Sequence, residues 1–151
     1  MTNILTVSGE GIFITRIFDA PREAVYDAWT TPTSFAVWFG GPDVDVPIES
    51  CKIDAVVGGS WQATMVLPDG NQINWSGEFQ EIVFPKRLVL TMKDRPGPNF
   101  EPLTIEFREL AGKTEMTFHQ FGGNLDTTGY EQAGAGWMIF FDTMERFISL
   151  T

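Results

Sequence analysis

The residues that could take part in chemistry are few, and the sequence places no partner beside them. His119, the sole histidine, alternates with Phe118 and Gln120 in a strand-like segment. An exposed structural histidine is therefore favoured over a proton-transfer group at a pocket mouth. Cys51, the sole cysteine, has no adjacent histidine and is interpreted as a structural thiol rather than a nucleophile. Without a second His or Cys at ligand spacing, we predict no metal site, and we expect no cofactor.

Glycines and acidic pairs elsewhere also favour structural roles. The segment VVGGSW, residues 56–61, precedes neither a helix nor a Lys-Ser or Lys-Thr pair. It predicts a tight turn between strands rather than a phosphate-binding loop. Asp43 and Asp45 are expected on one strand face, where burial would raise one carboxyl pKa, but solvated edge charges are favoured. We therefore predict no catalytic residue, and the sequence favours a protein that is not an enzyme.

Arg16 is the unusual charge, because it lies within the apolar segment GIFITRIF, residues 11–18. A buried arginine needs a carboxylate partner. Glu78 and Glu106, each on a predicted strand, are the expected partners in an ion pair between strand surfaces. The alternative is that Arg16 anchors an acidic or carbonyl group of a ligand.

Composition narrows the class of protein. Twenty acidic residues against ten basic ones give a net charge of −10, which repels nucleic acid and anionic lipid surfaces. Neither a signal peptide nor a stretch of about 18 apolar residues is visible, so membrane insertion is not expected. One cysteine in 151 residues suits a reducing compartment, and we expect a cytoplasmic protein.

Five stretches of the sequence indicate the elements that must position these residues. A strand is predicted at 11–18, a short helix at 21–30, and a two-turn helix between 31 and 40. From 43 to 121 the apolar period is two and turn motifs recur, which predicts six antiparallel strands. A long helix is expected at about 128–150. The chain is therefore predicted to form a single α+β domain, 1–151, with about seven strands curved around the C-terminal helix.

The strand faces that would meet this helix are apolar and aromatic, and small residues such as Ala63, Gly134 and Gly136 could leave room between sheet and helix. A packed core is the competing interpretation. The predicted pocket residues are Met65, Trp75, Gly77, Phe79, Leu90, Phe107, Phe118, Gln120, Trp137 and Phe141. The candidate polar anchors are Arg16, Asn74 and Tyr130.

The closing segment GWMIFFDTMERFISL, residues 136–150, is apolar on more of its surface than one core requires. Met138 and Ile139 lie towards the polar side of this predicted helix. We expect the loops, the two short helices or a partner to cover them. A monomer and a homodimer both stay open.

Three segments carry a resemblance to a known family. ITRIFDAPREAVYDAWTTPTSFAVWFG, DAVVGGSWQATMVLPDGNQINWSGEFQEIVFPKRLVLT and GWMIFFDTMERFISL resemble proteins related to the activator of heat shock protein 90 ATPase. The resemblance implies the helix-grip (START-like) fold of the SRPBCC superfamily, shared with the birch pollen allergen, which commonly encloses an apolar cavity. Chaperone-activating members also carry an N-terminal second domain, which this sequence lacks, so chaperone activation is not the favoured function.

The favoured function is non-catalytic binding of a hydrophobic or amphipathic small molecule between sheet and helix. The first alternative is a co-chaperone-like, stress-response module that contacts a heat shock protein 90 type ATPase through Met138, Ile139 and the corner at 38–40. The second is an enzyme of the cyclase or hydratase kind.

Overall fold

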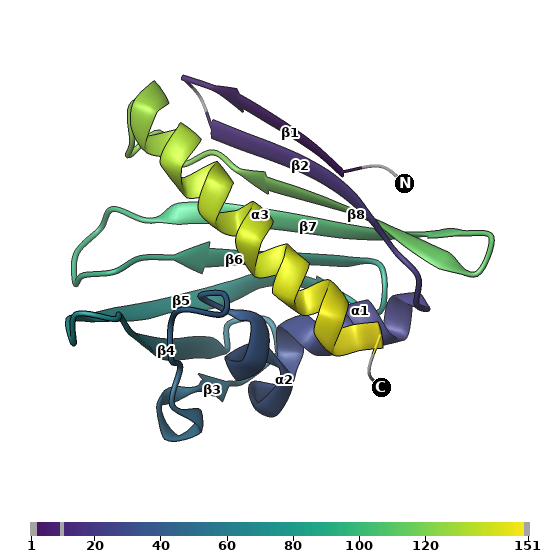
Figure 1. The fold of residues 1–151 in the computed structure, drawn as a ribbon, viewed down its shortest axis with the longest axis horizontal. Coiled ribbons are helices and arrows are strands. Elements are labelled where there is room, and N and C mark those ends of the chain that lie inside the picture. The colour runs from purple at the N-terminus through teal and green to yellow at the C-terminus, as the bar shows by residue number, and fades with distance from the viewer. Residues whose placement is uncertain (1–2, 10, 150–151) are drawn as a thin grey trace.

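The computed structural model describes residues 3–9 and 11–149. An antiparallel sheet of eight strands, in the order β1-β2-β8-β7-β6-β5-β4-β3, carries a long helix on one face (Figure 1). The strands are β1 (Asn3–Ser8), β2 (Gly11–Phe18), β3 (Lys52–Ile53), β4 (Ser60–Val66), β5 (Gln72–Val83), β6 (Arg87–Met92), β7 (Glu101–Leu110) and β8 (Lys113–Gln120). The helices are α1 (Arg22–Thr30), α2 (Pro32–Trp38), the 3-10 turn η1 (Ile48–Ser50) and α3 (Thr127–Ser149).

Three strands differ between the prediction and the structure. The strand expected at 43–48 is reduced to a single bridge between Asp45 and Val66, because Pro42 and Pro47 flank it and cannot donate backbone hydrogen bonds. The edge strand β1 was not predicted, since its polar residues obscure a short alternation. β1 pairs with β2 along its length, and the two-residue strand β3, which was also not predicted, brings the count to eight.

The two short helices are confirmed, and the break between them has a local cause. Thr31 has an extended backbone, φ −102° and ψ 121°, as expected for a residue that precedes a proline. Pro32 then opens α2 at its first position. Across the break, Trp38 Nε1 donates a 2.7 Å hydrogen bond to the carbonyl oxygen of Ala28. This bond fixes the angle between α1 and α2.

The long helix α3 crosses the sheet diagonally, from the edge at β1 towards α1 (Figure 1). The predicted helix is confirmed as far as Ser149, and its expected last residue, Leu150, lies outside the described residues. The buried positions of α3 are Tyr130, Gly134, Trp137, Phe141, Met144 and Ile148. Their spacing of three and four defines the face that meets the sheet. We call the sheet face under α3 the inner face.

The apolar middle of α3 is covered on two flanks. A Cβ built on Gly134 would lie 3.0 Å from Leu5 Cδ1, so the helix approaches β1 closely there. On the other flank, the loop after α2 reaches Ile139, whose Cγ2 would lie 2.9 Å from a Cβ at Gly41. Met138 is half-buried, whereas Ile139 remains 51% exposed. The loop therefore covers only part of the surface formed by Met138 and Ile139.

Candidate functional site

A cluster of aromatic rings fills much of the space between the inner face and α3. Trp137 lies 4.6 Å from Phe118 and 5.6 Å from Phe141, measured between ring centroids. Trp29, from α1, and Phe39, directly after α2, contact the same indole at 6.1 and 6.2 Å. Ring pairs at such separations pack as in a protein core. The predicted pocket residues therefore touch one another directly over a large part of this region.

Most of the predicted pocket residues lie between the inner face and α3. The buried ones are Met65, Gly77, Phe79, Leu90, Phe107, Phe118, Gln120, Trp137 and Phe141. Trp75 is only half-buried and lies beside Phe39, at the rim of the cluster. Asn74 does not join them, because it is exposed on the opposite face and accepts a hydrogen bond from Thr64.

Gly77 does not provide pocket volume. A Cβ on this residue would overlap the backbone oxygen of Thr91, on the neighbouring strand β6. The same oxygen accepts a 2.8 Å hydrogen bond from Trp61 Nε1, so an indole occupies the space beside the glycine. The glycine is required because two strands and an indole meet there.

A buried polar chain lies at the end of β8. Trp137 Nε1 donates to Gln120 Oε1 at 2.8 Å, and Gln120 Nε2 donates to Glu101 Oε1 at 3.1 Å. Gln120 and Glu101 are 5% and 9% exposed. Gln120 was predicted to point inward, but Glu101 was missed. Its spacing of two and four from Leu103 and Ile105, both inward-facing, is the signal that could have found it.

The loop between β8 and α3 closes over the same carboxylate. Asn124 donates to Glu101 Oε2 from both its backbone nitrogen and its side-chain amide. A Cβ on Gly122 would overlap this oxygen, so a glycine is needed for the close approach. Tyr130 is completely buried, and burial, with a hydrogen bond to Glu101 and its charge, raises the pKa of the phenol. Neutral donors therefore surround Glu101, and Tyr130 stays protonated at neutral pH.

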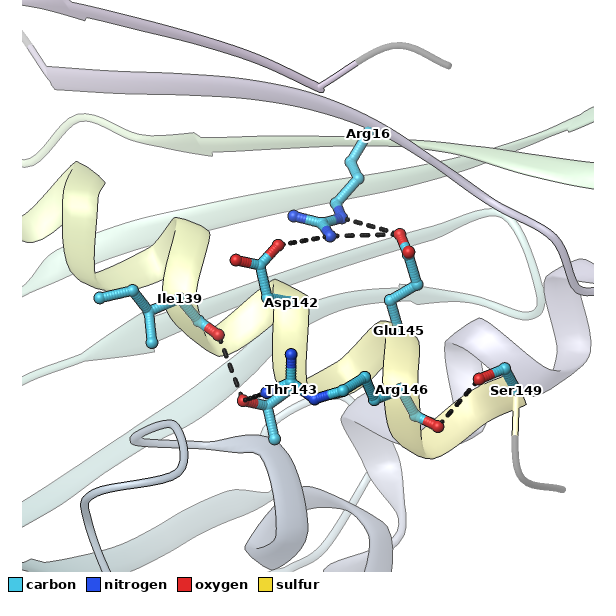
Figure 2. Close-up of polar contacts among 7 residues, drawn as sticks. All are labelled: Arg16, Ile139, Asp142, Thr143, Glu145, Arg146 and Ser149. Carbon is cyan, nitrogen blue, oxygen red and sulfur yellow. Dashed lines mark hydrogen bonds and ion pairs between the residues drawn. The ribbon is translucent and has the colours of Figure 1, made fainter.

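Arg16 joins the sheet to α3 (Figure 2). Its Nη2 lies 2.7 Å from Asp142 Oδ1 and 3.1 Å from Glu145 Oε1, and its guanidinium is almost completely buried. The predicted partners Glu78 and Glu106 are wrong. Both point away from the inner face, whereas Arg16 lies under the polar stripe of α3.

One nitrogen of Arg16 has no acceptor. Nη1 is buried without a hydrogen-bond partner in the described part of the chain. Figure 2 shows it directed along α3 towards Ile139 and away from Glu145. The carboxylates that neutralise the cation are 53% and 39% exposed, so the charge is balanced at the helix surface.

The remaining candidate groups show no sign of chemical reactivity. Burial raises the pKa of the Cys51 thiol to about 11, so the thiolate is scarce at neutral pH. Asp43 and Asp45 are exposed. Across residues 3–9 and 11–149, no three His, Cys, Asp or Glu side chains are arranged to hold a metal ion, and no helix is long and apolar enough to cross a membrane.

His119 lies on the outer face of β8, with ring centroids 4.4 Å from Phe121 and 5.7 Å from Phe13. Partial burial lowers its pKa below the model-peptide value of 6.5. We expect an NMR titration of this sole imidazole to show a midpoint below 6.5. The unfolded chain therefore binds a proton at His119 more readily than the folded protein does. The contribution of His119 to the free energy of unfolding is fully present above pH 6.5 and is lost as the pH falls towards the folded-state pKa. A midpoint above 6.5 would contradict this placement.

The long helix across an open antiparallel sheet, with two short helices after β2, defines the helix-grip (START-like) fold. A protein of Chromobacterium violaceum has a similar structure, with 21% identity, a TM-score of 0.83 and coverage of 93% of this chain and 98% of that one. A protein of Nitrosomonas europaea gives 23% identity, a TM-score of 0.79 and coverage of 91% and 93%. An AHSA1-like protein of Aeromonas hydrophila gives 24%, 0.74, and 91% and 92%.

The sequence pattern of one family matches residues 19–149, nearly the whole chain. The chain belongs to the family described as Activator of Hsp90 ATPase homolog 1-like protein. No curated protein matches it. At identities below 25%, the structural relatives establish the fold and leave the function to be argued from the residues.

Proposed function

We propose that the protein binds a hydrophobic or amphipathic small molecule between the inner face and α3, without changing it covalently, in a reducing cytoplasm. The observation that carries this proposal is the unpartnered indole nitrogen of Trp75. Its Nε1 is buried and has no acceptor among the described residues, although the side chain is only half-buried at the rim of the aromatic cluster. A buried donor without a partner costs about 1–3 kcal/mol. An oxygen atom of a ligand would remove this cost.

The neighbours of Trp75 support an opening at this rim. Ile73 precedes it on the same face of β5 and is half-buried. Phe140, from α3, is also half-buried and lies 5.8 Å from Phe39. Trp75 and Phe140 both contact Phe39, and partly exposed apolar side chains near an unpartnered donor suit an amphipathic molecule, whose apolar part would displace Phe140 or Trp75.

The non-catalytic part of the proposal rests on the inward polar groups. Gln120 and Glu101 are committed to hydrogen bonds with the protein, and Arg16 is committed to two carboxylates. A general acid or base must reach a substrate proton at about 2.6–3.2 Å. Protein partners already lie within hydrogen-bond distance of these groups. This arrangement disfavours the cyclase or hydratase alternative.

A Trp75→Phe substitution tests the proposal, since it keeps the ring and deletes the donor. Native mass spectrometry of gently purified protein, followed by titration with fatty acids and sterols, is expected to identify a bound class of ligand. For an oxygen-bearing ligand, the substitution should weaken binding about tenfold, the equivalent of 1.4 kcal/mol. Phe13→Leu, on the outer face, is the matched control and should change nothing. Equal affinity of wild type and Trp75→Phe, or no binding across the panel, would refute the proposal.

The second candidate function is binding to a chaperone ATPase, and it is favoured by exposed apolar residues on neighbouring helices. Ile139 on α3 and Val37 on α2 are 51% and 48% exposed. However, Trp38 and Phe39, expected in this surface, are buried. An Ile139→Ser variant should abolish any stimulation of a heat shock protein 90 ATPase if this function holds.

A further inference from the structure

A polar groove of about 620 Å³ lies over β4 and β5, where the polar side chains of the outer face, opposite α3, gather. The turn at 93–96, after β6, forms one of its walls. Its polar lining includes the side chains of Gln62, Thr64, Asn74, Ser76, Lys93 and Arg95. Alternation along β4 and β5 points Gln62, Thr64, Asn74 and Ser76 away from α3, and Ala63 and Trp75 of the same strands also contribute to the lining.

Strand register places the lining side chains in a regular array. Gln62 is paired with Ser76, and Thr64 with Asn74, across β4 and β5. Ser76 and Lys93 exchange both backbone hydrogen bonds at 2.9 Å, which extends the first row to a third strand. Neighbouring strands are about 4.8 Å apart, so the array is about 10 Å across. This width matches a small polar molecule.

Much of the hydrogen-bonding capacity in the groove is unused. Thr64 donates to Asn74 Oδ1 at 2.8 Å, which leaves the amide nitrogen of Asn74 without an acceptor in the described residues. Lys93 Nζ donates to the carbonyl oxygen of Gly97 at 3.1 Å and has two further hydrogens. Arg95 uses only Nε, which donates to Asp94. Several donors therefore converge on one space.

The charge of the groove is opposite to that of the whole chain. Lys93 and Arg95 face a single lining carboxylate, Asp94, in a protein with a net charge of −10. An anion is attracted here, while the rest of the acidic surface repels it. Charged donors bind phosphate strongly, and amides and hydroxyls such as Gln62 and Ser76 bind sugar hydroxyls. We propose that this groove binds a small phosphorylated sugar or polyol.

The test uses the full chain and three probes: glucose 6-phosphate, glucose and inorganic phosphate, in low-salt buffer. Glucose 6-phosphate is expected to shift the backbone amide signals of β4, β5 and the 93–97 turn, and to bind at least tenfold more tightly than glucose or phosphate. Absence of binding would overturn the proposal. Equal affinity for phosphate would also overturn it, because the groove would then be only a general anion contact.

Variants separate the groove from the remaining surface. Lys93→Gln should weaken binding of glucose 6-phosphate at least tenfold, whereas Lys113→Gln, at the exposed first residue of β8, should leave it unchanged. Asn74→Asp places a negative charge in the groove at nearly constant size and should abolish binding. Equal effects of Lys93→Gln and Lys113→Gln would refute the proposal.

Discussion

Gly77→Ala is expected to destabilise the protein by at least about 4 kcal/mol, or to prevent folding. The added Cβ would overlap the backbone oxygen of Thr91, and neither a strand backbone nor the Trp61 indole bonded to that oxygen can move away cheaply. Urea unfolding followed by tryptophan fluorescence would measure the loss. Both β5 and β6 must shift to accept the methyl group, so the loss extends beyond one contact.

Gly136→Ala is the matched control, since it adds the same methyl group within α3. The nearest atom, Phe140 Cζ, would lie 3.9 Å from the new Cβ, an ordinary contact. Alanine is favoured over glycine within a helix, so this variant should gain about 0.5–1 kcal/mol. A loss below about 1 kcal/mol for Gly77→Ala would show that β5 and β6 are not so closely apposed.

The double substitution Asp142→Asn and Glu145→Gln is expected to cost about 3 kcal/mol. It leaves the Arg16 cation, 2% exposed, without a counter-charge, and removing one side of a buried ion pair typically costs about 3–5 kcal/mol. The lower end of this range applies because Asp142 and Glu145 are partly exposed, so water screens the pair. Thermal and urea unfolding at pH 7 would measure the effect.

Two further variants distinguish this effect from a general loss of charge. Arg16→Met removes the cation itself, leaves an apolar side chain on the inner face, and should cost less than the double substitution. Arg108→Gln breaks an exposed pair with Glu115 and should change the free energy of unfolding by less than about 1 kcal/mol. If the double substitution costs no more than Arg108→Gln, Arg16 is not buried as described.

The elements that sequence predicted well are those with a strong local signal. The break at Thr31 and Pro32 separates two helices in any tertiary setting, and alternation from Ser60 onward defines the strands of the meander. β1 carries only Leu5 and Val7 as inward apolar residues, and its identity as a strand depends on pairing with β2. Local pattern alone could not provide that pairing.

The candidate site was predicted in part for the same reason. Gln120 was expected inward from strand phase, and the structure places it there, bonded to Trp137. The predicted partners of Arg16 were wrong because the actual partners depend on which part of α3 crosses β2. No short-range sequence pattern specifies that crossing. Glu101 was missed because a carboxylate buried among neutral donors is unusual, and its donors come from a distant loop.

The pairing of β2 with β8 also determines when the protein can fold during its synthesis. Ile12 lies opposite Gln120, so the first long strand has no second neighbour until nearly the whole chain has left the ribosome. At about 5–20 residues per second, this delay is on the order of 10 s. Trp29 and Trp38, buried in the finished fold, would remain exposed to other nascent chains during that interval.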